Sequence, residues 1–242
     1  MRIVVLAANE RRMSHPRSRP GDRPTARGGR AVLPAALHWP IGTLALLGAL
    51  LVAVPAAFYA GEDGPGRFDR WIQSGMDSVP QSDAVALGVD VLGRPVVAAV
   101  VVAALAVLCV VLGRRRLAMV ALAGPAATVA AATVLKPVVN RTIYGEFLAY
   151  PSGHTALAVA LGIVLGLLLA DLWRQRPSRE AGWVAGALVV VASACIAGAV
   201  MSWAMITLGA HYPTDTVGGF GTALAIVPAT AWLIDWVADS RH

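Results

Sequence analysis

The chain has 242 residues, of which 57% are hydrophobic and only 14% are charged, and its mean hydropathy is +0.66. This balance excludes an ordinary soluble protein, in which about 25% of residues are charged. The formal net charge of +6 would suit a nucleic acid, but the arginines gather in a few short segments. We therefore expect a membrane protein and no nucleic-acid partner.

Apolar runs follow a basic N-terminal tail. The tail, residues 1–37, is rich in Arg, Pro and Gly, so we expect it to be disordered and to act as a topology signal or to bind anionic membrane lipids. A hydrocarbon core of ~30 Å requires about 20 apolar residues per helix. Runs of that length predict six transmembrane helices, at about 38–60, 95–113, 117–135, 153–173, 183–207 and 215–238. The sequence thus predicts an all-α fold, with a six-helix membrane domain over residues 38–240.

Arginine placement indicates how these helices are oriented. Arginines recur in the tail and in the short turns Arg114-Arg115-Arg116 and Arg174-Gln175-Arg176, whereas the alternate loops carry more carboxylates. Short basic turns mark the cytoplasmic side of a membrane. We therefore expect a multi-pass protein of the plasma membrane with both termini in the cytoplasm and with loops 61–94, 136–152 and 208–214 outside.

The first candidate site is Pro151-Ser152-Gly153-His154, where an outer loop meets an apolar run. Ser152 is a favoured N-cap, and a helix start offers unpaired N–H groups and partial positive charge, which bind phosphate. Gly153 lets a phosphate approach the backbone, and His154 is placed to protonate a leaving oxygen. An ordinary capped membrane helix with an interfacial histidine has the same sequence features.

A second histidine and two cations accompany this segment. His211 and Asp215 begin the last apolar run, four residues apart, so Asp215 is expected to accept the Nδ1–H of His211 and to leave Nε2 as a nucleophile. Lys136 and Arg141 precede Ser152 and would neutralise a phosphoryl group. Each residue also suits an ordinary structural role, as a helix cap, an interface anchor or a solvated cation.

Together these residues resemble the type 2 phosphatidic acid phosphatase superfamily of integral membrane lipid phosphatases. The family pattern is a lysine followed by Arg-Pro, then Pro-Ser-Gly-His, then Ser-Arg with a later His and Asp. The segment Pro151 to His154 matches in full, and His211 and Asp215 match at the expected spacing.

Two parts of the pattern differ. The Arg-Pro pair falls on Ile143-Tyr144, with Arg141 as a candidate substitute two residues earlier, and the Ser-Arg pair falls on Ala204-Met205. Loss of these guanidinium contacts would weaken activity or shift the headgroup preference. Tyr144 and Glu146 are candidates for lining the altered pocket.

The resemblance implies a metal-independent phosphatase that needs no cofactor. In the implied mechanism, Nε2 of His211 attacks phosphorus to form a phosphohistidine while Asp215 stabilises the imidazolium. His154 protonates the leaving group and then activates water. The phosphoryl oxygens would be held by Lys136, Arg141, Ser152 and Gly153. The implied substrate is a polyprenyl diphosphate or a phospholipid phosphate such as phosphatidic acid, met at the outer leaflet.

Two alternatives from other classes remain open. One is a non-catalytic lipid-phosphate binder or flippase that kept the fold after losing the arginines. The other is a small transporter, although its proton path would need ionisable groups at depth, and the apolar runs carry them near their ends. A soluble haloperoxidase would share the phosphate pocket, but the hydrophobic runs exclude it.

Overall fold

The computed structural model describes residues 31–32, 38–78, 82–174 and 182–240, with the backbone alone at 38–41, 174 and 182–183. Apart from residues 31 and 32, the predicted tail lies outside the described residues, as does most of the turn that follows Arg174. Val32 is buried, and its backbone N–H donates to an Asp235 carboxylate oxygen at 3.0 Å. Val32 therefore packs against α8.

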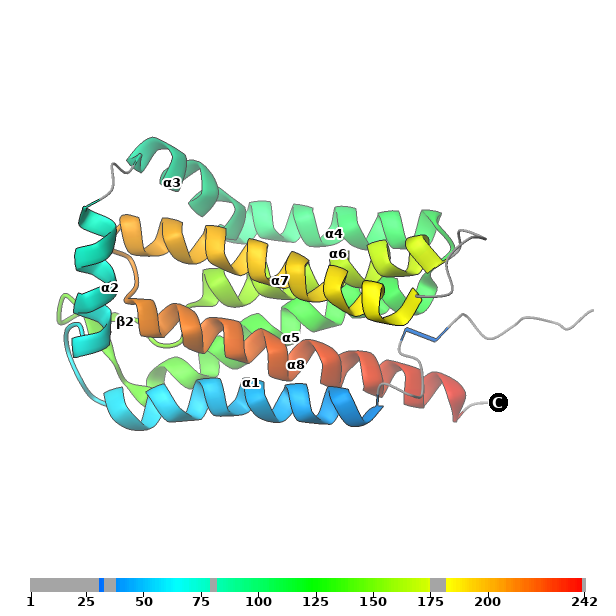
Figure 1. Ribbon diagram of the computed structural model, residues 1–242, viewed down its shortest axis with the longest axis horizontal. Helices are drawn as coiled ribbons and strands as arrows, with labels where there is room; N and C mark the ends of the chain where they lie inside the picture. Colours follow the sequence, from blue (N-terminus) through cyan, green and yellow to red (C-terminus); the bar gives the residue numbers. More distant parts are fainter. Residues whose placement is uncertain (1–30, 33–37, 79–81, 175–181, 241–242) are drawn as a thin grey trace, which may run out of the picture.

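Most of the described chain is helical. Its helices are α1 (His38–Tyr59), α2 (Arg67–Asp77), α3 (Asp83–Asp90), α4 (Pro95–Val111), α5 (Arg115–Val139), α6 (Gly153–Arg174), α7 (Gly182–Thr207) and α8 (Pro213–Asp239). A short 3-10 helix, η2 (Val91–Gly93), joins α3 to α4, and β1 (Thr142–Ile143) pairs with β2 (Phe147–Leu148) in an antiparallel hairpin. Long α-helices arranged side by side form the bundle (Figure 1). The predicted all-α fold is confirmed.

The six predicted spans correspond to the six longest helices. Within the described residues, five helices are long and apolar enough to cross a membrane by themselves. The remaining span is α4, which qualifies together with the α3–η2 segment although the two parts are bent by 65°. By length and composition, the described part of the chain therefore has five or six helices that could cross a membrane.

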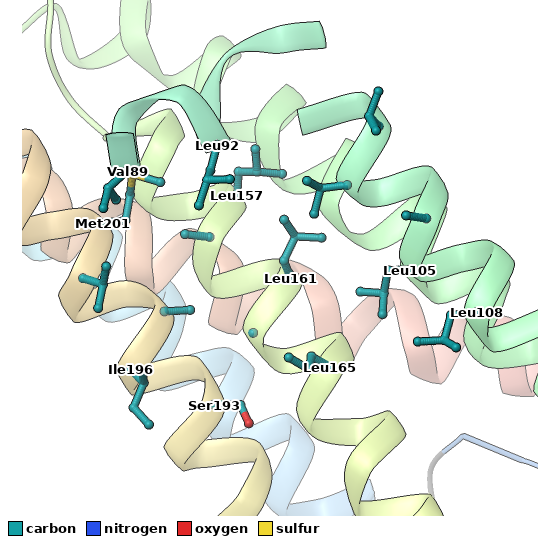
Figure 2. Close-up of a pocket in the computed structure, with 17 residues that line it drawn as sticks. Val89, Leu92, Leu105, Leu108, Leu157, Leu161, Leu165, Ser193, Ile196 and Met201 are labelled. Carbon is teal, nitrogen blue, oxygen red and sulfur yellow. The ribbon is translucent and has the colours of Figure 1, made fainter. Parts of the chain in front are cut away.

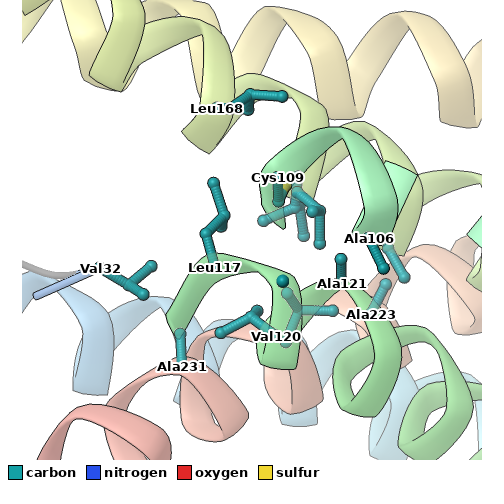
Figure 3. Packing of buried hydrophobic residues seen from close by; sticks show 14 of the residues in the cluster. Val32, Ala106, Cys109, Leu117, Val120, Ala121, Leu168, Ala223 and Ala231 are labelled. Atoms are coloured by element: carbon teal, nitrogen blue, oxygen red, sulfur yellow. The ribbon is translucent and has the colours of Figure 1, made fainter. Parts of the chain in front are cut away.

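Helix α6 forms the centre of the bundle and packs against α5, α7 and α8. Its contact with α7 is close because two glycines face that helix: a Cβ on Gly162 would lie 2.7 Å from the Ser193 carbonyl oxygen, and one on Gly166 would lie 2.6 Å from Val190 Cα. Small residues allow such backbone approach in membrane helices. The main apolar cluster joins α4, α5, α6 and α8 around Cys109 and Val120 (Figure 3).

The two ends of the bundle differ in structure. One end carries α2, α3 and the hairpin, and α8 begins there; the start of α1 and the C-terminus lie at the other end (Figure 1). Ion pairs join helices at this second end, between Arg114 and Asp171 and between Arg116 and Asp235. The predicted outer loops thus gather at a single end, although loop 61–94 contains two short helices that the hydropathy pattern did not indicate.

Candidate active site

The two histidine motifs meet where α6 and α8 begin. The backbone N–H of Ser152 donates to the Asp215 carbonyl oxygen at 2.9 Å, which ties the two helix starts together. Gly219 in α8 permits this approach, because a Cβ at that position would lie 2.4 Å from the Ser152 carbonyl oxygen. The tie places the motif Pro151 to His154 beside the motif that contains His211.

Unpaired amides are available at the first turn of α6. Ser152 is fully buried, and its hydroxyl oxygen accepts the N–H of Thr155 at 3.4 Å as an N-cap. The amides of Gly153 and His154, which follow the cap, show no hydrogen-bond partner among the described residues. Such N-terminal amides are oriented outward and carry partial positive charge. This geometry matches the phosphate site that the sequence predicts.

His154 faces a carboxylate that the sequence analysis did not single out. Its Nε2 lies 3.4 Å from Asp90 Oδ1, and Asp90 Oδ2 accepts the Nε–H of Arg94 at 3.1 Å. The charges of His211 and Lys136 also act on His154. The backbone bond between Ser152 and Asp215 keeps His154 and His211 at the same end of the bundle. Asp90 ends α3 and Arg94 is the N-cap of α4, so the turn η2 between them brings the carboxylate and the guanidinium together.

Asp215 is held in place by several donors, but not by His211. Its Oδ2 accepts the backbone N–H of Tyr212 at 2.8 Å, and its Oδ1 accepts an N–H of Arg141 at 2.6 Å. His211 Nδ1 lies 3.7 Å from Oδ2 and has no hydrogen-bond partner among the described residues. The predicted carboxylate–imidazole pair is thus adjacent, without the short hydrogen bond. In empty active sites such bonds are often long and shorten around the substrate.

Arg141 occupies a buried network behind His211. Its guanidinium is fully buried and bonds Asp69 and Asp215, both at 2.6 Å, and it also donates to the Thr214 hydroxyl at 2.6 Å. The rings of Tyr59 and Tyr212 flank it, 4.2 and 4.7 Å from the guanidinium carbon. This buried environment differs from the solvated loop position that was the ordinary alternative to the predicted phosphate-binding role.

Asp69, from α2, completes this network and was not predicted. Burial alone would raise its pKa, but hydrogen bonds from Arg141, Thr214 and Gly66 outweigh burial and lower the pKa below the usual aspartate value. The carboxylate is therefore held in its charged form. Its partners lie more than seventy residues away in the chain, except for Gly66 at the start of its own helix.

Lys136 lies in the last turn of α5 rather than in the loop beyond it. Its Nζ donates to the Leu148 carbonyl oxygen at 2.6 Å, which places the ammonium group under the hairpin. Its charge also interacts with that of Asp215 and with His154. Lys136 is therefore close to both histidine motifs, as the sequence predicts.

Apolar side chains fill the positions at which the family pattern has arginine. Ile143, in strand β1, is buried against Ala149 and Tyr212, and Met205 is buried in an apolar cluster with Met201. Tyr144 and Glu146 are exposed on the hairpin, where the Tyr144 hydroxyl donates to the Gly209 carbonyl oxygen at 3.0 Å. The hairpin is thus connected to the loop that leads to His211.

An apolar cavity begins beside the histidine site. It has a volume of about 830 Å³ and lies between the α3–η2 segment, α4, α6 and α7 (Figure 2). Val89 and Leu92 line one part of it, next to the pair Asp90 and Arg94, and the cavity continues along α6 to Leu165. Ser193 is the one polar residue in this lining. The cavity thus adjoins a charged pocket with space for an apolar chain.

These features describe an α-helical bundle whose helices are long and apolar enough to cross a membrane, with two histidine motifs side by side at one end. Residues 135–239 match the model of the PAP2 superfamily, which confirms the recognition made from the motifs. The matched region contains both histidine motifs, Lys136 and Arg141. Neither a curated protein nor a solved structure matches the chain. The matched superfamily is one of phosphatases that act on lipid phosphates.

Proposed function

We propose that this protein is a metal-independent phosphatase that hydrolyses a lipid phosphate or diphosphate through a phosphohistidine intermediate at the outer leaflet of the plasma membrane. The observation behind this proposal is the joint start of α6 and α8, where the backbone bond between Ser152 and Asp215 sets the two histidine motifs and the free amides of α6 side by side. The adjoining apolar cavity supports a substrate with a hydrocarbon tail.

The proposed reaction has two displacements at phosphorus. His211 Nε2 forms a bond to phosphorus as the bond from phosphorus to the leaving oxygen breaks, and His154 gives that oxygen a proton. A water oxygen then attacks phosphorus and loses a proton to His154, and the phosphorus–nitrogen bond breaks to release phosphate and free His211. Asp215 stabilises the imidazolium formed in the first step.

The cations have separate roles in this scheme. Lys136 and the amides of Gly153 and His154 stabilise negative charge on the phosphoryl oxygens. Arg141 faces Asp215 in a buried network, so we assign it to holding this carboxylate rather than to binding phosphate. Ser152 caps α6 and fixes the direction of its amides.

The cavity restricts the substrate class. Leu165 lies eleven positions after His154 on α6, which corresponds to about 16 Å along the helix. This length is roughly half the thickness of a bilayer's hydrocarbon core. A polyprenyl diphosphate and a phospholipid phosphate such as phosphatidic acid both combine a phosphate with a long apolar chain. Phosphate release from each in detergent, compared with release from a water-soluble phosphate ester, tests this assignment.

Histidine variants test the chemistry directly. We expect His211→Ala and His154→Ala to abolish turnover while the protein remains folded in the membrane. His38→Ala is the matched control, since His38 begins α1 at the opposite end of the bundle. Wild-type turnover by the His211→Ala protein would refute the mechanism. Phosphate binding without release by the wild-type protein would favour the non-catalytic binder.

Labelling of single cysteines tests the side of the membrane. Glu146 is exposed on the hairpin at the site end, and Ser240 follows α8 at the other end. In a background without Cys109 and Cys195, Glu146→Cys should react with a membrane-impermeant maleimide in intact cells. Ser240→Cys should react only after lysis, and the opposite pattern would place the site in the cytoplasm.

A further inference from the structure

Residues 89–94, from the end of α3 through η2 to the N-cap of α4, place charged groups beside His154. None of the family motifs includes this segment. Asp90 contacts His154 at 3.4 Å, and a Cβ on Gly93 would lie 1.9 Å from the His154 ring. Only glycine at position 93 therefore allows this segment to contact the imidazole. Val89 and Leu92 of the same segment line the apolar cavity. One short stretch of chain thus lies between the charged pocket and the cavity.

Arg94 is the guanidinium placed at this junction. It precedes the first turn of α4, and its Nε–H donates to Asp90 Oδ2 at 3.1 Å, one carboxylate away from His154. Its side chain is 58% exposed, so the guanidinium is accessible to a ligand. By contrast, Arg141 is fully buried and already bonded to two carboxylates. Arg94 is therefore accessible to a ligand, whereas both terminal nitrogens of Arg141 are already bonded in a buried network.

We propose that Arg94 binds the substrate phosphate beside His154, and that Asp90 holds the guanidinium there while the pocket is empty. This proposal rests on the proposed function, because it adds a binding group to the same site. An arginine from the start of α4 would supply a guanidinium to a site whose family pattern has arginine at two positions that are here the buried apolar residues Ile143 and Met205. Arginine binds phosphate through paired N–H donors, which a carboxylate occupies only until the phosphate arrives.

Inorganic phosphate provides a test that is independent of turnover. Phosphate is titrated into purified protein in detergent and its binding followed by the broadening of the phosphorus NMR signal. Arg94→Gln should weaken binding roughly ten- to hundredfold, the value expected for lost charge-assisted hydrogen bonds. Arg67→Gln is the matched control, because Arg67 is an exposed arginine on α2 at the same end of the bundle, and this change should leave binding unaltered.

A variant of Asp90 separates binding from a merely structural pair. If Arg94 binds phosphate, Asp90→Asn removes a competing anion and binding stays equal to wild type or strengthens. Equal loss in Asp90→Asn and Arg94→Gln would mean that the pair only shapes the pocket, and would overturn the proposal. Unaltered phosphate binding by Arg94→Gln, or no binding by the wild-type protein, would also overturn it.

Kinetics distinguish this proposal from the proposed function. With a lipid phosphate, Arg94→Gln should raise KM more than it lowers kcat, whereas His211→Ala removes turnover. If the wild-type protein binds phosphate through Arg94 but releases none from any lipid, the proposed phosphatase function fails while the binding role of Arg94 stands. If the protein is active and Arg94→Gln leaves KM unchanged, the phosphatase function stands and the binding role of Arg94 fails.

Discussion

Removal of the Arg141 guanidinium should destabilise the protein strongly. Arg141 lies between two fully buried carboxylates, Asp69 and Asp215, and bonds each at 2.6 Å. In Arg141→Met both carboxylates lose their buried counter-charge. Breaking a buried ion pair by removing one partner costs about 3–5 kcal/mol, because it leaves an uncompensated charge. For a protein of this size we expect the unfolding temperature to fall by roughly 10 °C.

Two cysteines in different environments provide an assay. Cys109 is buried within the bundle and Cys195 is exposed, so Cys195→Ser gives a background in which labelling by a thiol-reactive dye reports exposure of Cys109. Unfolding is followed as the dye fluorescence rises on heating the purified protein in detergent. Arg70→Met is the matched control: Arg70 is exposed on α2, and its change should alter stability by less than about 0.5 kcal/mol.

A double variant identifies the cause of the effect. Asp69→Asn in the Arg141→Met background removes one of the two unpaired charges, so it should recover roughly 1–3 kcal/mol, the range found for coupled neighbours. A phosphate-binding role for Arg141 predicts a different result, namely an unchanged unfolding temperature and a raised KM. That result, or simple additivity of the two changes, would refute the structural role.

The long helices were predictable because hydropathy is a local property of the chain. A run of about 20 apolar residues specifies a membrane helix wherever it lies. The first turn of α6 was predictable for the same reason, because a serine N-cap marks a helix start from local sequence alone. The free amides then belong to the residues that follow it, Gly153 and His154. The four-residue spacing of His211 and Asp215 also predicted that they lie close together, which they do at 3.7 Å.

The partners of Arg141 and His154 were not predictable from local patterns. Asp69 and Asp90 belong to short helices within a loop, and their distances from these partners depend on how α2 and α3 fold over the end of the bundle. The hairpin β1–β2, which directly follows Arg141, was likewise not predictable, because hydropathy does not detect its turn. In the sequence, Arg141 is a cation near a phosphate motif, which suggests phosphate binding. In the structure, its buried partners Asp69 and Asp215 place it in an ion-pair network instead.

Three further results are expected. Folding lowers the pKa of Asp69, so its charged form stabilises the folded protein above the unfolded pKa of ~3.9. This stabilisation is lost as the pH falls through the lower pKa of the folded state. The unfolding temperature should therefore drop below about pH 4, and it should drop less in Asp69→Asn. EDTA should leave phosphate release unchanged, because Lys136 and helix amides supply the positive charge; a loss that added metal restores would contradict this. Ala104→Trp narrows the apolar cavity from α4, so kcat/KM for a lipid phosphate should fall at least roughly tenfold while turnover of a water-soluble ester persists. Ala103→Trp, on the exposed neighbouring residue outside the cavity, should change neither, and equal losses with both substrates would show that the cavity does not hold the lipid chain.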